Sequence, residues 1–163
     1  MRTRVDDTLP APADVLGLRL WLGRHMEEAG YRLAYRSGER SYANPITRWI
    51  VLRDSADLTT ARGVALLAHE VAHARQQSGP WWYRWAWGLR YLADPWFRRA
   101  CEVEAEAWWV AVMVRLTDGT VDALAAKSHS LGRWRSPHYT PGDPDEMTRR
   151  IAARAREILG NAT

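Results

Sequence analysis

Residues 66–77 read Leu-Leu-Ala-His-Glu-Val-Ala-His-Ala-Arg-Gln-Gln, an apolar stretch interrupted by two histidines and a glutamate. In a helix, four residues turn the chain through about 400°, so His69 and His73 lie about 40° apart on one face. Two imidazoles placed in this way can share one metal ion. Glu70 lies one position further round the helix, where its carboxylate can reach a water activated by the ion. The pattern predicts a helix that carries a metal site.

The far face of the same helix is expected to be buried. Val64, Leu67, Val71 and Ala74 form an apolar stripe on it, and the small Ala72 leaves room beside the histidines. A helix that is apolar on one side and presents two histidines on the other is what a buried zinc site requires. The alternative is a chance match of a short pattern, in which both histidines have only structural roles.

A catalytic zinc ion needs a third protein ligand and an open position. The candidates downstream are Glu102, Glu104, Glu106, His129 and His138. In the helix predicted over 96–116, Glu102 and Glu106 lie about 40° apart, on the stripe of Trp109 and Met113. Glu104 faces the opposite side, near Arg115. Because carboxylates on an apolar stripe are costly unless paired or bound to metal, Glu102 and Glu106 are the better candidates. The alternative is a solvated acidic turn near a helix start.

The two motifs together resemble a family. His69-Glu70-x-x-His73 followed by Glu102-x-x-Ala105-Glu106 resembles the gluzincin zinc metallopeptidases, whose pattern is H-E-x-x-H and then E-x-x-x-D or E-x-x-A-D on a downstream helix. The short length, and strands before the active-site helix, make the chain most similar to the minigluzincins and to the catalytic core of the CAAX-processing-type peptidases. The resemblance is local and covers residues 31–116.

The resemblance implies a set of roles around one Zn²⁺ per chain. It makes His69, His73 and Glu102 the metal ligands and Glu70 the general base. Glu106 falls where the family has the aspartate that orients a ligand histidine, and this sequence departs from the family there by one methylene. A longer carboxylate can still accept the imidazole proton.

The resemblance also implies where a peptide or protein substrate binds. The family holds the substrate backbone along an edge strand, which here corresponds to residues 47–53. The substrate-binding residues are then Arg48, Trp49, Ile50 and Val51. The family also supplies a histidine or tyrosine that stabilises the oxyanion, and the candidates for this role are His138 and Tyr139.

The patterns along the chain predict a single α+β domain over residues 1–163. We expect an N-terminal helix at 13–29, a small antiparallel sheet from strands 31–35 and 47–53, and a mostly helical remainder with helices near 60–77, 81–92, 96–116, 121–127 and from Pro144 onward. Asp143, Pro144 and Glu146 are typical of a helix start. Residues 1–12 are expected to be a flexible lead.

Four of the ten tryptophans lie between Trp81 and Trp87. If this segment is helical, one face carries Trp81, Trp82, Trp85, Leu89 and Leu92. Our interpretation is that this helix packs on the metal-binding helix with its rings in the core. Two alternatives are a wall for apolar substrate side chains and a helix at a membrane surface, with Trp and Arg at headgroup level.

The composition of the chain limits which classes of protein it can belong to. The chain has 163 residues and one cysteine, Cys101, which excludes a disulfide framework and a cysteine-rich zinc module. No run of about 18 apolar residues and no signal peptide is visible, so we expect a cytoplasmic protein. The net charge is +4, but the basic residues are spread along the chain, so no specific nucleic-acid binding is expected.

The sequence therefore predicts a zinc-dependent peptidase, with two alternatives. One is a protein that binds zinc without turnover as a component of a larger assembly. The other is a tryptophan-rich interaction module that binds no metal.

Overall fold

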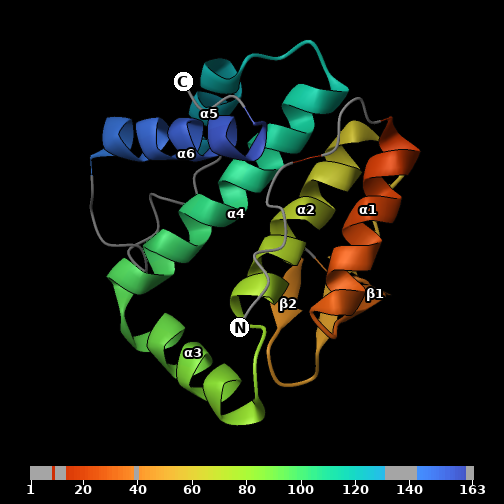
Figure 1. Cartoon of the computed structure of the whole chain (residues 1–163), viewed down its shortest axis with the longest axis vertical. Coiled ribbons are helices and arrows are strands. Elements are labelled where there is room, and N and C mark those ends of the chain that lie inside the picture. Colours follow the sequence, from red (N-terminus) through yellow and green to blue (C-terminus); the bar gives the residue numbers. More distant parts are fainter. Residues whose placement is uncertain (1–8, 10–13, 39–40, 131–142, 161–163) are drawn as a thin grey trace.

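The computed structural model describes residues 9, 14–38, 41–130 and 143–160. Its elements in chain order are α1 (Val15–Glu28), β1 (Arg32–Arg36), β2 (Tyr42–Asn44), β3 (Trp49–Arg53), α2 (Ala61–Gln76), α3 (Trp81–Ala93), α4 (Pro95–Leu116), α5 (Val121–Ser130) and α6 (Pro144–Ile158). This is an α+β fold, as predicted, with an N-terminal helix, a small sheet and a mostly helical remainder (Figure 1).

Local capping signals determine where the helices begin. The Thr60 side chain accepts a hydrogen bond from Gly63 N at the start of α2, and the Asp94 carboxylate accepts two from the first turn of α4. Asp143 caps α6 in the same way, with Pro144 in the first turn. A side-chain oxygen at this position satisfies an N–H group that the helix itself leaves without a partner. These caps explain why the predicted helix starts are close to the observed ones.

The sheet is mixed, so the expectation of an antiparallel sheet is wrong. Its strand order is β1-β3-β2; β1 pairs with β3 in parallel, and β2 pairs with β3 antiparallel. The reason is the short strand β2, which the sequence analysis did not predict. The chain reverses between β1 and β2 and again between β2 and β3, so β3 runs in the same direction as β1.

The strand order also overturns the idea that residues 47–53 form an edge strand. Trp49, Ile50 and Val51 lie in β3, the central strand, and each pairs with a residue of β1 and of β2. Ile50 is fully buried, and Arg48 lies in the turn before the strand with φ 57°. A substrate backbone cannot add to β3, because β1 and β2 already occupy its two sides.

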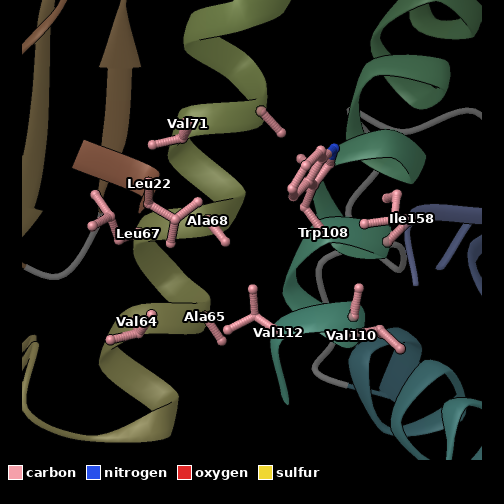
Figure 2. Close-up of a cluster of buried hydrophobic side chains, with 14 of the residues drawn as sticks. Leu22, Val64, Ala65, Leu67, Ala68, Val71, Trp108, Val110, Val112 and Ile158 are labelled. Atoms are coloured by element: carbon pink, nitrogen blue, oxygen red, sulfur yellow. The ribbon is translucent and has the colours of Figure 1, made fainter. Parts of the chain in front are cut away.

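Helix α2 lies at the centre of the core, with α1 and the sheet on one side and α4 on the other (Figure 2). Val64, Leu67 and Val71 point away from α4 and are buried, as predicted for the apolar face of this helix. On the opposite side, Ala65 faces Val112 of α4. Small residues along this side allow the two helices to approach closely.

The far side of α4 is covered by α5 and α6 (Figure 1). A bidentate ion pair joins α4 to α6: Arg154 donates to Glu104 over 2.7 and 3.0 Å. The Trp108 indole donates to the same carboxylate over 3.1 Å. Glu104 is therefore a structural anion between two helices, on the side of α4 away from α2.

The tryptophan-rich segment forms α3 but does not fill the core with its rings. The main neighbour of α3 is the start of α4, which covers the side of α3 that carries Trp87 and Tyr91. Helix α2 meets α3 where Tyr83 donates to the Gln76 carbonyl and where Tyr91 meets His73. The Trp87 ring is buried, stacks on Tyr91 at 4.9 Å and meets Phe97 edge-on at 5.9 Å. The face that we expected in the core is exposed to solvent; it comprises Trp81, Trp82, Trp85, Leu89 and Leu92.

Two further expectations concern the chain start and membranes. Of residues 1–12, expected to be flexible, the structure describes Leu9 alone. Leu9 is buried, and its N–H donates to the Ile158 carbonyl over 2.9 Å, so this residue is held against α6. Among the helices in the described ranges, none combines the length and the apolar character needed to cross a lipid bilayer.

Candidate metal centre

Three buried side chains from two helices converge at one point. His69 and His73 come from α2 and Glu102 comes from α4, and one ligand atom of each lies within 4.8 Å of the other two. Nε2 of His73 is 3.4 Å from Oε1 of Glu102, and Nε2 of His69 is 3.8 Å from Oε2 of Glu102. The structure thus brings together the three residues proposed as ligands from the sequence.

The close packing of α2 on α4 makes this convergence possible. His69 and His73 are one turn apart on the side of α2 that faces α4. Beside them, Ala72 of α2 and Ala105 of α4 are both buried. Since neither alanine adds bulk between the helices, the side chain of Glu102 can reach both imidazoles.

The outer nitrogen of His73 is held by an amide. Nδ1 of His73 lies 3.1 Å from Oε1 of Gln76, and Nε2 of Gln76 donates to the Cys101 carbonyl over 2.9 Å. Because Gln76 presents an oxygen to Nδ1, that nitrogen carries the proton and Nε2 is left to face Glu102. An imidazole oriented in this way is ready to bind a metal through Nε2.

The outer nitrogen of His69 faces a carboxylate. Nδ1 of His69 is 3.7 Å from Oε1 of Glu106, and the Ser128 hydroxyl of α5 donates to Oε2 of Glu106 over 2.6 Å. Both Glu106 and Ser128 are buried. Glu106 thus lies beside His69, one of the proposed ligands, where the resemblance implies an orienting carboxylate, despite its extra methylene.

The charges of the site are coupled. Burial by itself lowers the pKa of His73, but the carboxylate of Glu102 outweighs this and, with smaller contributions from Glu70 and Gln76, raises it to about 9. Burial raises the pKa of Glu102. His73 and, to a smaller extent, His69 lower this pKa by more than burial raises it, so it lies well below its usual range. Without a metal, Glu102 and His73 therefore form a buried ion pair.

A hydroxyl from α3 also reaches the site. Tyr91 donates a short hydrogen bond to Oε1 of Glu102, and its ring meets that of His73 edge-on at 6.3 Å. Tyr91 was not predicted from the sequence, because its position depends on the angle between α3 and α4, which no spacing rule encodes. Gln76 and Ser128 were not predicted either, although Gln76, three residues after His73, shares its helix face.

A carboxylate, Glu70, and a thiol, Cys101, also lie near the site. Glu70 is buried on α2 and contributes to the electrostatic field at His73, so its carboxylate lies close to the ligands. Cys101 precedes Glu102 and is also buried. Burial and the Glu102 charge raise the pKa of its thiol to about 12, so a metal-binding thiolate is disfavoured there.

The remaining candidates from the sequence are His129, His138 and Tyr139. His138 and Tyr139, the candidates for oxyanion stabilisation, lie outside the described residues. His129 falls within α5, so it lies in a helix of the described chain.

The donor set of the cluster fits a metal ion. Zinc binds imidazole nitrogens and carboxylate oxygens at about 2.0–2.2 Å, which places neighbouring ligand atoms roughly 3.4 Å apart in a tetrahedron. The distance from His73 to Glu102 matches this value, and the others are somewhat longer. His69, His73 and Glu102 can therefore hold one metal ion. Comparisons with family models, curated proteins and solved structures find no match for the chain.

Proposed function

We propose that the chain is a zinc-dependent peptidase. The observation that supports this most is the meeting of Glu102 with His69 and His73, with Glu70 buried beside them. Two imidazoles and one carboxylate are the ligand set of many catalytic zinc sites, in which a fourth position stays open for water or substrate. A buried carboxylate next to the ligands supplies the base that such a site needs.

The proposed mechanism divides the work among these residues. A zinc ion at this position would polarise the peptide carbonyl and lower the pKa of water to about 7. Glu70 takes a proton from the attacking water and then gives it to the leaving amine. Glu106 and Gln76 hold the two ligand imidazoles by their outer nitrogens, so that both Nε2 atoms stay aimed at Glu102.

Tyr91 is a candidate for a second role at this site. Its hydroxyl is a hydrogen-bond donor beside the metal ligands. A donor there can stabilise the negative charge that develops on the carbonyl oxygen during hydrolysis. Within the described residues, Tyr91 is thus a candidate for the function that the family resemblance assigned to His138 or Tyr139.

The proposal is tested by separating metal binding from turnover. Glu70→Gln should keep one zinc per chain by elemental analysis and lose peptide hydrolysis by at least about 100-fold, because the base is missing. His73→Ala should lose both zinc and activity, because it removes a ligand. Hydrolysis is measured on a quenched-fluorescence peptide library that the wild type cleaves.

The outcomes distinguish the competing functions. Zinc bound by the wild type, with no hydrolysis of any library peptide, would favour the non-catalytic zinc protein. No zinc after reconstitution would contradict the metal site. If Glu70→Gln is as active as the wild type, Glu70 is not the base and the mechanism fails.

A further inference from the structure

The outer face of α3 and the start of α4 carry large apolar side chains that are exposed to solvent. Its members are Trp81, Trp82, Trp85, Leu89, Leu92 and Trp96, and their exposed fractions range from 50% to 72%. We call this set the tryptophan face. Single exposed apolar residues are common, but five large ones on one helix face, with a sixth at the start of the next helix, are typical of a binding site.

The geometry of α3 explains why these residues share one side. At 100° per residue, the exposed large side chains of α3 span about 100° of the helix, and the buried Trp87 and the inward-facing Tyr91 lie beyond them. The remaining exposed residues of α3 are two alanines and Arg90. Tyr91 contacts Glu102 from the inner side, so α3 separates the metal site from the tryptophan face.

The position of α3 leaves this face accessible. The helix lies at one end of the long axis of the molecule, below α2 and α4 in the view of Figure 1. The turn between β2 and β3 comes close to it, since a Cβ on Gly88 would lie 3.9 Å from Pro45. Ile46 in that turn is 56% exposed. An exposed apolar side chain, Ile46, therefore follows the residue of this turn that approaches α3.

The charges around the tryptophan face are mainly positive. Residues 81–100 contain four arginines against a single acidic residue, Asp94. Arg99 is buried and pairs with Glu146, whereas Arg84, Arg90 and Arg98 are at least partly exposed. The carboxylate of Asp94 caps α4 and pairs with Arg90 over 3.4 Å, so these two charges largely cancel, and Arg84 and Arg98 supply the positive charge of this end of the molecule. Tryptophan with arginine at its edge matches the lipid headgroup region, where the ring lies among the upper acyl chains and the guanidinium meets phosphate.

We propose that the tryptophan face docks the protein on the surface of an anionic lipid bilayer, with α3 lying parallel to the membrane plane. Three observations favour lipid over a protein partner. The face is the outer side of a helix at the end of the molecule, which a flat bilayer can reach. Its aromatic residues are tryptophans, the type enriched at membrane interfaces. Its charge is complementary to phosphatidylserine or phosphatidylglycerol headgroups. The inference goes beyond the proposed function and does not depend on bound metal.

The test is sedimentation of the full chain with vesicles of phosphatidylcholine and phosphatidylserine in equal parts. The wild type should sediment with them, and less with vesicles of phosphatidylcholine alone. Raising the salt from about 0.1 M to about 1 M should weaken binding, because the Debye length falls from about 10 Å to about 3 Å. Glu70→Gln should bind the vesicles as the wild type does. Failure of the proposed peptidase activity and failure of vesicle binding can therefore be distinguished.

A matched pair of variants identifies the face. Leu89→Ser/Leu92→Ser on α3 should reduce vesicle binding at least about tenfold, because two exposed apolar side chains leave the lipid contact. Leu16→Ser/Leu20→Ser makes the same change at leucines of α1 that are 53% and 58% exposed, and should leave binding unchanged. All four positions are exposed, so both variants should keep the wild-type circular dichroism and melting temperature.

Three results would overturn the proposal. The first is a wild type that stays in the supernatant with anionic vesicles. The second is equal loss of binding in both leucine pairs, which would mean general stickiness. The third is a concentration-dependent dimer that Leu89→Ser/Leu92→Ser abolishes, which would assign the face to a second copy of the chain.

Discussion

Glu102 is the group at which the interactions of the site meet. Both imidazoles of α2 approach its carboxylate, and the hydroxyl of Tyr91 donates to it from α3. It is buried and ionised, a state that its partners maintain against the cost of burial. Removing one partner from such a cluster leaves a buried charge uncompensated, so we expect substitutions here to affect both the proposed metal binding and folding.

Substituting the three glutamates of α4 should give a clear order of zinc affinity. We expect Glu102→Ala to weaken zinc binding by orders of magnitude and Glu106→Ala by about 10–100-fold, because Glu106 acts only through His69. Glu104→Ala should leave the affinity unchanged. Chelator competition on the purified variants measures all three.

Glu104→Ala is also a control for folding. It breaks the ion pair with Arg154 and should lower the melting temperature while zinc affinity is retained. If Glu104→Ala instead releases zinc, the ligand assignment on α4 is wrong.

The pH dependence of the metal-free protein follows from His73. Its pKa is raised from 6.5 to about 9 in the folded state, so its ion pair stabilises the fold fully below pH 6.5. This contribution is lost as the pH rises from 6.5 through 9. We therefore expect the melting temperature of the chelator-treated protein to fall over that range more than that of a Glu102→Gln variant, which lacks the pair.

The same proton competes with zinc for His73. Zinc affinity should rise about tenfold per pH unit up to about pH 9, because one proton is released for each ion bound. An affinity that is independent of pH in this range would show that His73 is already neutral.

The site was predictable from the sequence to the extent that it depends on spacing along a helix. His69, Glu70 and His73 follow from a four-residue turn, and Glu102 follows from the stripe on its own helix. Tyr91, Gln76 and Ser128 were not predicted. Tyr91 and Ser128 reach the site through the packing of α3 and α5 on α4, and such contacts between helices leave no period in the sequence.

The start of α2 is fixed by a close approach of two backbone segments. A Cβ on Gly63 would lie 1.8 Å from the Asp57 carbonyl oxygen. That carbonyl also accepts hydrogen bonds from the backbone N–H and the hydroxyl of Thr60, so it cannot easily move aside. Glycine is therefore required here for its lack of a side chain.

We expect Gly63→Ala to destabilise the protein by about 1–3 kcal/mol or more, because the methyl group displaces a hydrogen-bonded loop. The matched control is Gly23→Ala in the interior of α1, where nothing lies within 4 Å of the added Cβ. That variant should gain about 0.5–1 kcal/mol from helix propensity. Urea unfolding of both variants measures the difference, and a Gly63→Ala variant as stable as Gly23→Ala would contradict the close approach.

The elements differ in how far the sequence predicts them. Helix starts were predicted well at Thr60, Asp94 and Asp143, because a cap is a local signal. The pairing of the strands was not predicted. The short strand β2 adds a second chain reversal, so β3 runs parallel to β1. The exposed side of α3 was predicted wrongly, because an apolar helix face in the sequence does not distinguish side chains that pack in the core from side chains that stay on the surface.

The contacts of α3 are unlike those of the other helices around the site. It packs mainly on the start of α4, and Trp87 is its buried residue. By contrast, α2 and α4 have buried side chains along most of their length. Stability within one molecule is uneven, and segments with few buried contacts open first.

Hydrogen exchange should reveal this difference. We expect the backbone amides of α3 to exchange faster than those of α2 and α4 by at least about 100-fold, because α3 can detach without unfolding the core. Mass spectrometry of peptides from deuterated protein measures this directly. Equal protection in α3 and α2 would show that α3 unfolds only with the rest of the molecule.

The contact between Tyr91 and Glu102 has a kinetic consequence. It joins the helix with the fewest buried contacts to a carboxylate at the centre of the ligand cluster. Release of a bound ion would include withdrawal of Glu102, and Tyr91 restrains that withdrawal for as long as α3 stays in place. The residence time of the ion would then follow the opening rate of α3, whereas its equilibrium affinity would follow the ligands. A change on α3 could therefore shorten occupancy without altering how tightly the resting site binds.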